Sequence, residues 1–272
     1  MTFVLKLGGS AGVDHTAVLR NLARRIGQGE TWLLVHGASD AANRLADEVG
    51  HPAQTITTPG GHTSRYTDAR TIAIFSAAAG SVNQQLTAQL SALGVNAVGL
   101  AGPNLIYARR HEAIRALRNG RQVIIRDDYS GAITGINTRP LQALIDAGLT
   151  PVIAPLAMGE QFERLNVDGD LVAATLAREL GATTLIILSN VPGLLRDVND
   201  ATSLIGQIAL RDLSQVERFA EGRMKKKLLA AQGAQVARVI LADSRVEAPI
   251  DAALNGAGTH ILSEVAHAEP NH

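Results

Sequence analysis

The sequence contains no cysteine, and this absence excludes several kinds of chemistry. Without thiols the chain forms no disulfide bridge, holds no thiolate zinc site and offers no cysteine nucleophile. Its eight histidines are scattered, with no HExxH motif and no pair spaced four residues apart, so a catalytic zinc site is not expected either. We therefore expect no metal centre held by the protein itself.

Aromatic residues and long hydrophobic runs are also scarce. Aromatic side chains make up only 3% of the 272 residues, and no apolar stretch approaches the roughly 18 residues that a membrane-spanning helix needs. The first residues, MTFVLKLGGS, lack the basic leader and apolar run of a secretory signal. Because 46% of the residues are apolar, the chain can still bury a core. These features predict a cytoplasmic protein without a membrane partner.

Neither sign of charge is in excess. The 25 basic and 25 acidic residues cancel, which argues against a nucleic-acid-binding protein. The basic residues are nevertheless chosen unevenly, since only four are lysines, at position 6 and at positions 225–227, and the others are arginines. Lysine at these two places therefore asks for a specific explanation.

Six of the arginines cluster between residues 108 and 126, where the one acidic residue is Glu112. They are Arg109, Arg110, Arg115, Arg118, Arg121 and Arg126. Such a basic patch can steer an acidic protein partner, although a solvated hairpin would carry the same residues. The patch falls within residues 105–136, where the turn dipeptides Asn119-Gly120 and Ser130-Gly131 predict a hairpin-rich insertion.

Hydrophobic patterning predicts an α/β fold with a mostly parallel sheet. A buried strand over residues 3–7 precedes a glycine turn and a helix over 14–26, and the order repeats with a strand over 31–36 and a helix to residue 49, capped by Ser39 or Asp40. Further strands are expected over 95–100, 150–154, 184–189 and 236–242, and further helices over 69–93, 141–147, 169–180 and 223–233. Residues 57–64 are predicted to form a loop, residues 266–272 a frayed tail, and Gly181 a lobe boundary.

Two glycine-rich turns follow the first two predicted strands. Gly8-Gly9-Ser10 and Gly37-Ala38-Ser39 let backbone N–H groups approach an anion, and a helix N-terminus follows each turn. Neither turn is a GxGxxG motif and no GxxxxGK[ST] motif occurs, which disfavours a dinucleotide-binding enzyme and a P-loop ATPase. Tight connections between strand and helix would use the same residues.

Cations stand close to these turns. Lys6 interrupts a buried strand two residues before the glycines, where an ammonium group is costly unless it finds a partner. The run Arg223-Met224-Lys225-Lys226-Lys227 opens a helix, where consecutive cations oppose the helix dipole unless an anion compensates them. Both signals indicate a bound phosphate, while snorkelling of Lys6 and a solvated face over 223–227 are the simpler explanations.

Three more polar clusters lie at the ends of predicted elements. Residues 166–170, with the sequence NVDGD, are typical of a helix N-cap. The carboxylate of Asp170 could in addition hold lysine ammonium groups in position. The Arg65 guanidinium can form two parallel hydrogen bonds to a carboxylate, or it can form an ordinary exposed salt bridge. The loop from Ser189 to Gly193 follows a strand, where open α/β sheets bind ligands, or it is an ordinary turn.

Taken together, these motifs resemble the amino-acid kinase family, which has the acetylglutamate-kinase fold. The matching pieces keep the family's order over nearly the whole chain: Lys6 to Ser10, Val35-His36-Gly37, Arg65 before Thr67-Asp68, residues 166–170, residues 189–193, and Gly222-Arg223-Met224 with Lys227 three residues after the methionine. The resemblance implies a three-layer α-β-α sandwich with a mostly parallel open sheet and two lobes. These would be an amino-acid lobe, residues 1–180, and a nucleotide-binding lobe, residues 181–272.

Within the family the chain is most similar to the carrier-protein-linked aminoadipate kinases of bacterial lysine biosynthesis. The similarity rests on residues 39–45, 61–68, 126–131, 166–170 and 223–227. It implies ATP-dependent phosphorylation of the side-chain carboxylate of an aminoadipate whose amino group is masked by a small acidic carrier protein. It also implies a homodimer, and Mg²⁺ held through the ATP phosphates. The arginine patch would suit such a partner.

The resemblance also implies roles for individual residues. Lys6 and Lys227 would act on the transferring phosphoryl group, and Asp170 would organise both. The substrate would contact Gly37, Ala38, Ser39, Arg65 and Asn166, and ATP would contact Gly8, Gly9, Ser10, Ser189, Asn190 and Gly193. The family has a second glycine where this chain has Ala38, whose methyl group would crowd the reacting carboxylate.

Three alternatives stay open at the level of the sequence. An N-acetylglutamate kinase of arginine biosynthesis would use the same catalytic residues. A kinase for glutamate on the same carrier would differ by one methylene of substrate, which a pocket discriminates by only about 1–3 kcal/mol. A regulatory subunit that senses nucleotides without catalysis would have no need of Lys6, Asp170 and Lys227 together.

Overall fold

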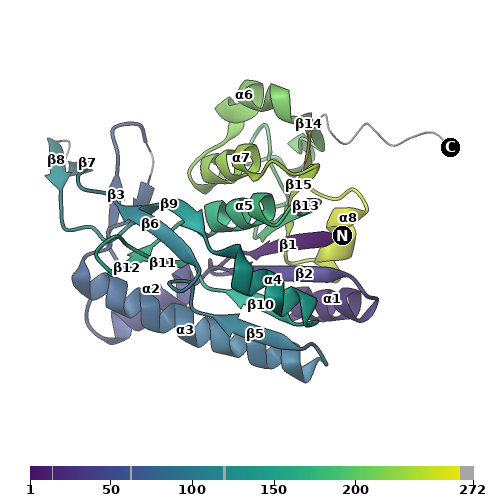
Figure 1. The fold of residues 1–272 in the computed structure, drawn as a ribbon. Helices are drawn as coiled ribbons and strands as arrows, with labels where there is room; N and C mark the ends of the chain where they lie inside the picture. Colours follow the sequence, from purple (N-terminus) through teal and green to yellow (C-terminus); the bar gives the residue numbers. More distant parts are fainter. Residues whose placement is uncertain (14, 62, 119–120, 264–272) are drawn as a thin grey trace.

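An eight-stranded sheet forms the centre of the protein in the computed structural model, which describes residues 1–13, 15–61, 63–118 and 121–263 (Figure 1). Its strands, in spatial order, are β14 (Gln207–Ala209), β16 (Thr259–Leu262), β15 (Arg238–Asp243), β13 (Thr184–Ser189), β1 (Thr2–Leu7), β2 (Thr31–His36), β10 (Thr150–Ile153) and β5 (Ala97–Leu100). Every neighbouring pair is parallel except β15 with β16. The predicted α/β fold with a mostly parallel sheet is therefore confirmed.

Helices cover both faces of this sheet and complete the expected three layers. The helices on one face are α4 (Thr138–Asp146), α5 (Gly169–Glu179) and α7 (Arg223–Ala234). Those on the other face are α1 (His15–Gly27), α8 (Pro249–Leu254) and the second half of α3 (Ala69–Ala92). The first half of α3 packs against α2 (Ser39–Glu48). Of the helices in the described ranges, none has the length and apolar character needed to cross a membrane.

Two small four-stranded sheets lie at the left of Figure 1, beyond the carboxyl ends of β1 and β2. One has the order β12 (Arg164–Asn166), β11 (Leu156–Met158), β6 (Ile106–Arg110), β9 (Gly131–Ile136). The other has the order β4 (Thr63–Arg65), β3 (Thr55–Thr57), β7 (Ile114–Arg118), β8 (Arg121–Ile125). Short helical turns, α6 (Leu213–Val216) among them, connect β14 to α7.

The structure corrects three local predictions. The Ser130-Gly131 turn is wrong, because Gly131 begins β9 and Ser130 bridges to β12. The loop predicted over residues 57–64 holds the end of β3 and the start of β4, which pair as a hairpin. Ser39 and Asp40 lie inside the first turn of α2, whose N-cap is Ala38. The Asn119-Gly120 turn and the tail 266–272 lie outside the described residues.

The alternation of side chains along β1 explains how a lysine enters the core. Val4 packs toward the layer of α5 and α7, whereas Leu5 and Leu7 pack toward the layer of α1. Because side chains alternate along a strand, Lys6 shares the face of Val4 and extends toward α5. The strand thus places the Lys6 ammonium group in the helical layer that contains α5, residues 169–179.

Candidate active site

A buried aspartate joins two lysines at the carboxyl end of the central sheet. The Nζ atom of Lys6 lies 2.8 Å from Asp170 Oδ1, and the Nζ atom of Lys227 lies 2.9 Å from Asp170 Oδ2. Lys6 is only 6% exposed, Asp170 7% and Lys227 8%. Asp170 stands in the first turn of α5, and Lys227 stands near the start of α7. Two cations share one carboxylate, which leaves a positive charge to receive an anion.

The charges of this cluster fix its protonation states. Burial would raise the pKa of Asp170, but the ammonium groups of Lys6 and Lys227 outweigh that effect and hold the pKa well below its usual range. Burial lowers the pKa of Lys227, and the Asp170 carboxylate opposes this change. Asp170 is therefore a fixed anion that holds cations in place rather than a group that exchanges protons.

The two glycine turns touch each other beside this cluster. The N–H of Gly8 donates to Leu188 O at 2.9 Å and the N–H of Gly37 donates to Leu7 O at 2.8 Å, so both amides extend the sheet. A Cβ on Gly9 would lie 2.2 Å from the carbonyl carbon of Gly37, which makes glycine necessary there. Ala38 fits because its side chain joins the apolar cluster between α2 and α3.

Two of the predicted substrate-contacting side chains are held by neighbours around the second glycine turn. Arg65 Nη2 donates to Ser39 O at 3.2 Å and to Asn43 Oδ1, so the guanidinium stands at the start of α2. Asn166 Nδ2 donates to Thr67 Oγ1 at 3.3 Å. The N–H of Thr67 in turn donates to the buried Asp128 carboxylate at 2.8 Å. The segment that carries Arg65 is thus linked to β12, which carries Asn166.

Arg223 is a further cation beside the site, named in the basic run of the sequence but given no role there. Its Nη1 donates to Ser10 Oγ at 2.6 Å, which joins the start of α7 to the first glycine turn. Burial, and then the positive charge of Arg223, lower the pKa of Arg65. Arg223 therefore lies within electrostatic reach of Arg65. The basic run over residues 223–227 was the available signal, although only Lys227 was selected from it.

The Ser189 to Gly193 loop lies next to the first glycine turn. Ser189 ends β13, which is the neighbour of β1 in the sheet. Asn190 Nδ2 donates to Ala11 O at 3.4 Å, immediately after Ser10. Gly193 has a φ of 152°, and a Cβ there would lie 2.6 Å from Thr259 Oγ1. The structure thus places Ser189 and Asn190 beside the first glycine turn, whereas Gly193 packs against β16.

The arginine cluster extends from the two small sheets and is not uniform. Arg109, Arg115, Arg121 and Arg126 are exposed. Arg110 is half-buried, because its guanidinium lies 3.8 Å from the ring centre of Tyr129 and its Nε donates to Asp128 O at 2.7 Å. The side chain of Arg118 lies outside the described part of the structure. Arg110 is therefore a packing residue, whereas the exposed members remain accessible.

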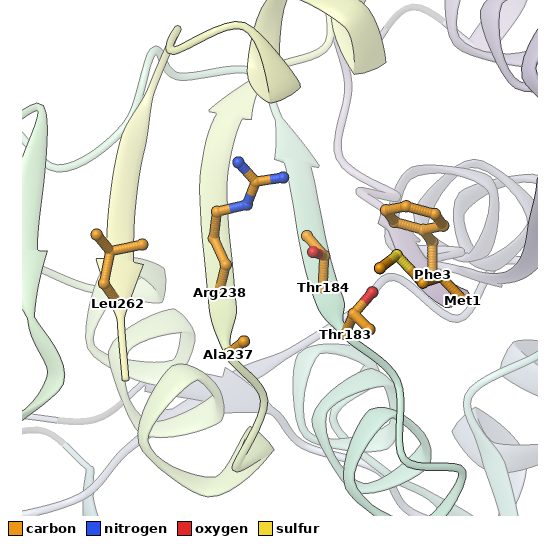
Figure 2. A pocket seen from close by; sticks show the side chains of 7 residues that line it. All are labelled: Met1, Phe3, Thr183, Thr184, Ala237, Arg238 and Leu262. Atoms are coloured by element: carbon orange, nitrogen blue, oxygen red, sulfur yellow. The ribbon is translucent and has the colours of Figure 1, made fainter. Parts of the chain in front are cut away.

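Two cavities lie away from the lysines. One, of about 360 Å³, is lined by residues at the amino ends of β1, β13 and β15, together with Leu262 (Figure 2). The other, of about 590 Å³, shares Arg238 and Leu262 with the first. Neither is lined by a residue predicted for the site. Among the described residues, no group of three or more His, Asp or Glu side chains is arranged to hold a metal ion.

His36, the last residue of β2, forms a buried polar contact beneath the second glycine turn. Asn83 Nδ2 donates to His36 Nε2 at 3.1 Å and to Val152 O at 2.8 Å, and the other ring nitrogen of His36 lies 3.2 Å from Gly37 O. Burial lowers the pKa of His36 to about 4, so the ring is neutral at physiological pH. A lone histidine at the end of an apolar strand was the sequence signal for this contact.

Comparisons with known proteins agree on one family. Residues 1–240 match the amino acid kinase family. The chain is 45% identical to a LysW-aminoadipate kinase of Deinococcus radiodurans over 94% of this chain and 90% of that protein. It is 41% identical to a LysW-aminoadipate kinase of Thermus thermophilus, over 94% and 98%. It is 38% identical to a putative LysW-aminoadipate/LysW-glutamate kinase of Pyrobaculum calidifontis, over 96% and 99%.

Solved structures show the same fold. An N-acetylglutamate synthase from Neisseria gonorrhoeae superposes with a TM-score of 0.78 at 23% identity, over 97% of this chain and 59% of that one. A carbamate kinase from Giardia lamblia superposes with a TM-score of 0.68 at 16% identity, over 97% and 98%. At these identities the likeness concerns the architecture alone.

The buried neutral state of His36 predicts a pH dependence of stability. The unfolded chain binds a proton on this histidine below its ordinary pKa of 6.5, whereas the folded chain does so only near pH 4. The free energy of unfolding should therefore fall as pH decreases through this window, by about 3 kcal/mol from this group. In urea titrations the difference between wild type and His36→Gln should shrink as pH falls from 7 to 4. A constant difference would contradict the assignment.

Proposed function

Because this chain belongs to the amino acid kinase family and is a phosphotransferase, we propose that it phosphorylates the side-chain carboxylate of L-2-aminoadipate while a small acidic carrier protein masks the amino group. The step belongs to lysine biosynthesis. The names of the relatives from Deinococcus radiodurans and Thermus thermophilus support this substrate, since both align over most of their length.

The observation that carries the proposal is the sharing of one buried carboxylate by Lys6 and Lys227. Asp170 keeps two compact ammonium groups at the end of the sheet where the glycine turns also lie. Ammonium groups fixed in a protected site stabilise the charge that spreads over a phosphoryl group during transfer. A chain that uses arginine nearly everywhere else has lysine at both positions, where a compact cation suits a phosphate oxygen.

In the proposed reaction a carboxylate oxygen of the substrate attacks the γ-phosphorus of ATP. The bond between this phosphorus and the β–γ bridging oxygen breaks, and the products are an acyl phosphate and ADP. Because the attacking carboxylate is already ionised, no side chain has to remove a proton. Lys6 and Lys227 stabilise the transferring group, and Asp170 holds both lysines in position.

The remaining site residues divide between the two substrates. Residues 1–180 form the acceptor lobe, where Gly37, Ala38, Ser39, Arg65 and Asn166 contact the aminoadipate. The nucleotide lobe, residues 181–272, contributes Ser189, Asn190 and Gly193 to ATP binding, and Gly8, Gly9 and Ser10 of the first glycine turn contact ATP from the acceptor lobe. Since both Asp170 oxygens face lysines, Mg²⁺ would be held by the ATP phosphates, where it would neutralise phosphate charge.

The carrier protein docks on the arginine cluster of the small sheets. Arg115 and Arg121 are exposed on the β7–β8 hairpin, and Arg126 is exposed directly after it. The hairpin projects at the left of Figure 1, on the side where β1 and β2 end. Positive charge at this place favours an acidic protein whose attached aminoadipate reaches the site. An enzyme acting on a small free acceptor has no evident use for the cluster.

A second candidate function is phosphorylation of glutamate on the same carrier. The relative from Pyrobaculum calidifontis is named for both substrates, and they differ by one methylene. N-acetylglutamate is a third acceptor to be tested, and a regulatory subunit without catalysis is the remaining alternative. We further infer a cytoplasmic homodimer, on the strength of the family resemblance.

A comparison of acceptors tests the proposal directly. ADP release should be robust with aminoadipate on the acidic carrier, weaker with carrier-linked glutamate, and low with free N-acetylglutamate. The reason is that the arginine cluster adds binding energy only for the carrier. Turnover of free N-acetylglutamate with none of the conjugate would refute the carrier proposal, and no turnover of any acceptor would favour the regulatory alternative.

Charge reversal tests the docking surface. Arg115→Glu and Arg126→Glu should each raise the KM for carrier-linked aminoadipate about tenfold at low salt, because they repel an acidic partner. The increase should shrink as salt is added. Arg20→Glu provides a matched control, since Arg20 is exposed on α1, outside the cluster. Equal KM values for all three variants would place the carrier elsewhere.

A further inference from the structure

The three consecutive lysines at the start of α7 have different surroundings. Lys227 is buried against Asp170, while Lys226 is partly buried with its Nζ 3.3 Å from Asp168 Oδ2. Lys225 is exposed and has no carboxylate within ion-pair distance among the described residues. Because cations at a helix N-terminus oppose the helix dipole, a carboxylate partner offsets an unfavourable position. Two of the three lysines have such a partner.

The Asp168 carboxylate serves two elements at once. Its Oδ1 accepts hydrogen bonds from the N–H groups of Asp170 at 2.9 Å and of Leu171 at 3.3 Å, which caps the N-terminus of α5. Its Oδ2 faces Lys226 on α7. The oxygen that pairs with Lys226 therefore belongs to the residue that fixes the first turn of α5, where Asp170 stands.

Adjacent residues of α7 thus reach alternate residues at the start of α5. Lys226 pairs with Asp168, and Lys227 pairs with Asp170. The side chains of the outer pair are 33% and 21% exposed, whereas those of the inner pair are 10% and 9% exposed. Asp168 also acts on the inner pair: burial lowers the pKa of Lys227, and the Asp168 carboxylate adds to the opposing effect of Asp170.

We propose that Lys226 is a positioning residue, which holds the start of α7 against α5 through Asp168 and so sets the place of the Lys227 ammonium group. This inference rests on the proposed role of Lys227 in phosphoryl transfer. Lys226 does not contact the reacting atoms. If Lys226 lay only on a solvated face, or bound the nucleotide itself, removal of the Asp168 charge would not reproduce the loss of rate caused by removal of Lys226.

A four-protein cycle with a matched control tests the inference. The proteins are wild type, Lys226→Met, Asp168→Asn and the double variant, and the control is Lys225→Met, which makes the same chemical change one residue away. Asn is as good an N-cap as Asp, so Asp168→Asn removes the charge and keeps the cap. With saturating ATP and acceptor, the kcat of Lys226→Met and of Asp168→Asn should each fall about fivefold.

The pattern among the variants separates positioning from other roles. The double variant should lose no more than either single variant, because each removes the same pair, and Lys226→Arg should recover most of the rate. The KM for ATP should stay near the wild-type value, and Lys225→Met should behave as wild type. Equal kcat for Lys226→Met and Lys225→Met would overturn the proposal. So would a raised KM for ATP in Lys226→Met alone, since that result would assign Lys226 to the nucleotide.

The free energy of unfolding of the same proteins provides a test that does not depend on the proposed function. If the pair holds α7 to α5, the effects of Lys226→Met and Asp168→Asn are not additive in the double variant. Additive effects would overturn the pairing. A wild-type enzyme that turns over no acceptor would refute the proposed function alone, and non-additive unfolding data would still support the contact.

Discussion

The site depends on one buried carboxylate between two buried ammonium groups. Each of the three groups would be costly to bury alone, and removal of a partner from such a cluster typically costs about 3–5 kcal/mol. Asp170 stands on α5, Lys6 on β1 and Lys227 on α7, so the contact connects the sheet with two helices of one layer. The arrangement leaves one positive charge in excess, which suits it to a phosphoryl group.

The parallel sheet places the other groups around this contact. Strands β13, β1 and β2 are neighbours and run in the same direction, so the turns that follow them meet at one edge. The close approach of Gly9 to Gly37 brings the two glycine turns into contact with each other. The small sheets then bring Arg65 and Asn166 from the opposite direction.

Much of this arrangement could be predicted from the sequence, and the limits have physical reasons. Lys6 was identifiable because a cation in an apolar strand needs a partner, and the parallel sheet followed from alternating strand and helix patterns. The contact of Arg223 with Ser10 joins residues 213 positions apart, and no local pattern encodes it. The same holds for Asn83 and His36, which meet only when α3 packs on the sheet. Short elements such as β3 and β4 were missed because three residues are too few for a periodic signal.

If the two lysines held by Asp170 act on the transferring phosphoryl group, as proposed, removal of either ammonium group slows the transfer. The most direct measurement is the initial rate of acyl-phosphate formation on carrier-linked aminoadipate, trapped with hydroxylamine, for wild type, Lys6→Ala and Lys227→Ala. Each variant should remain folded, and its kcat should fall by about 10²-fold or more. Near-normal kcat in either variant would contradict the role assigned to that lysine.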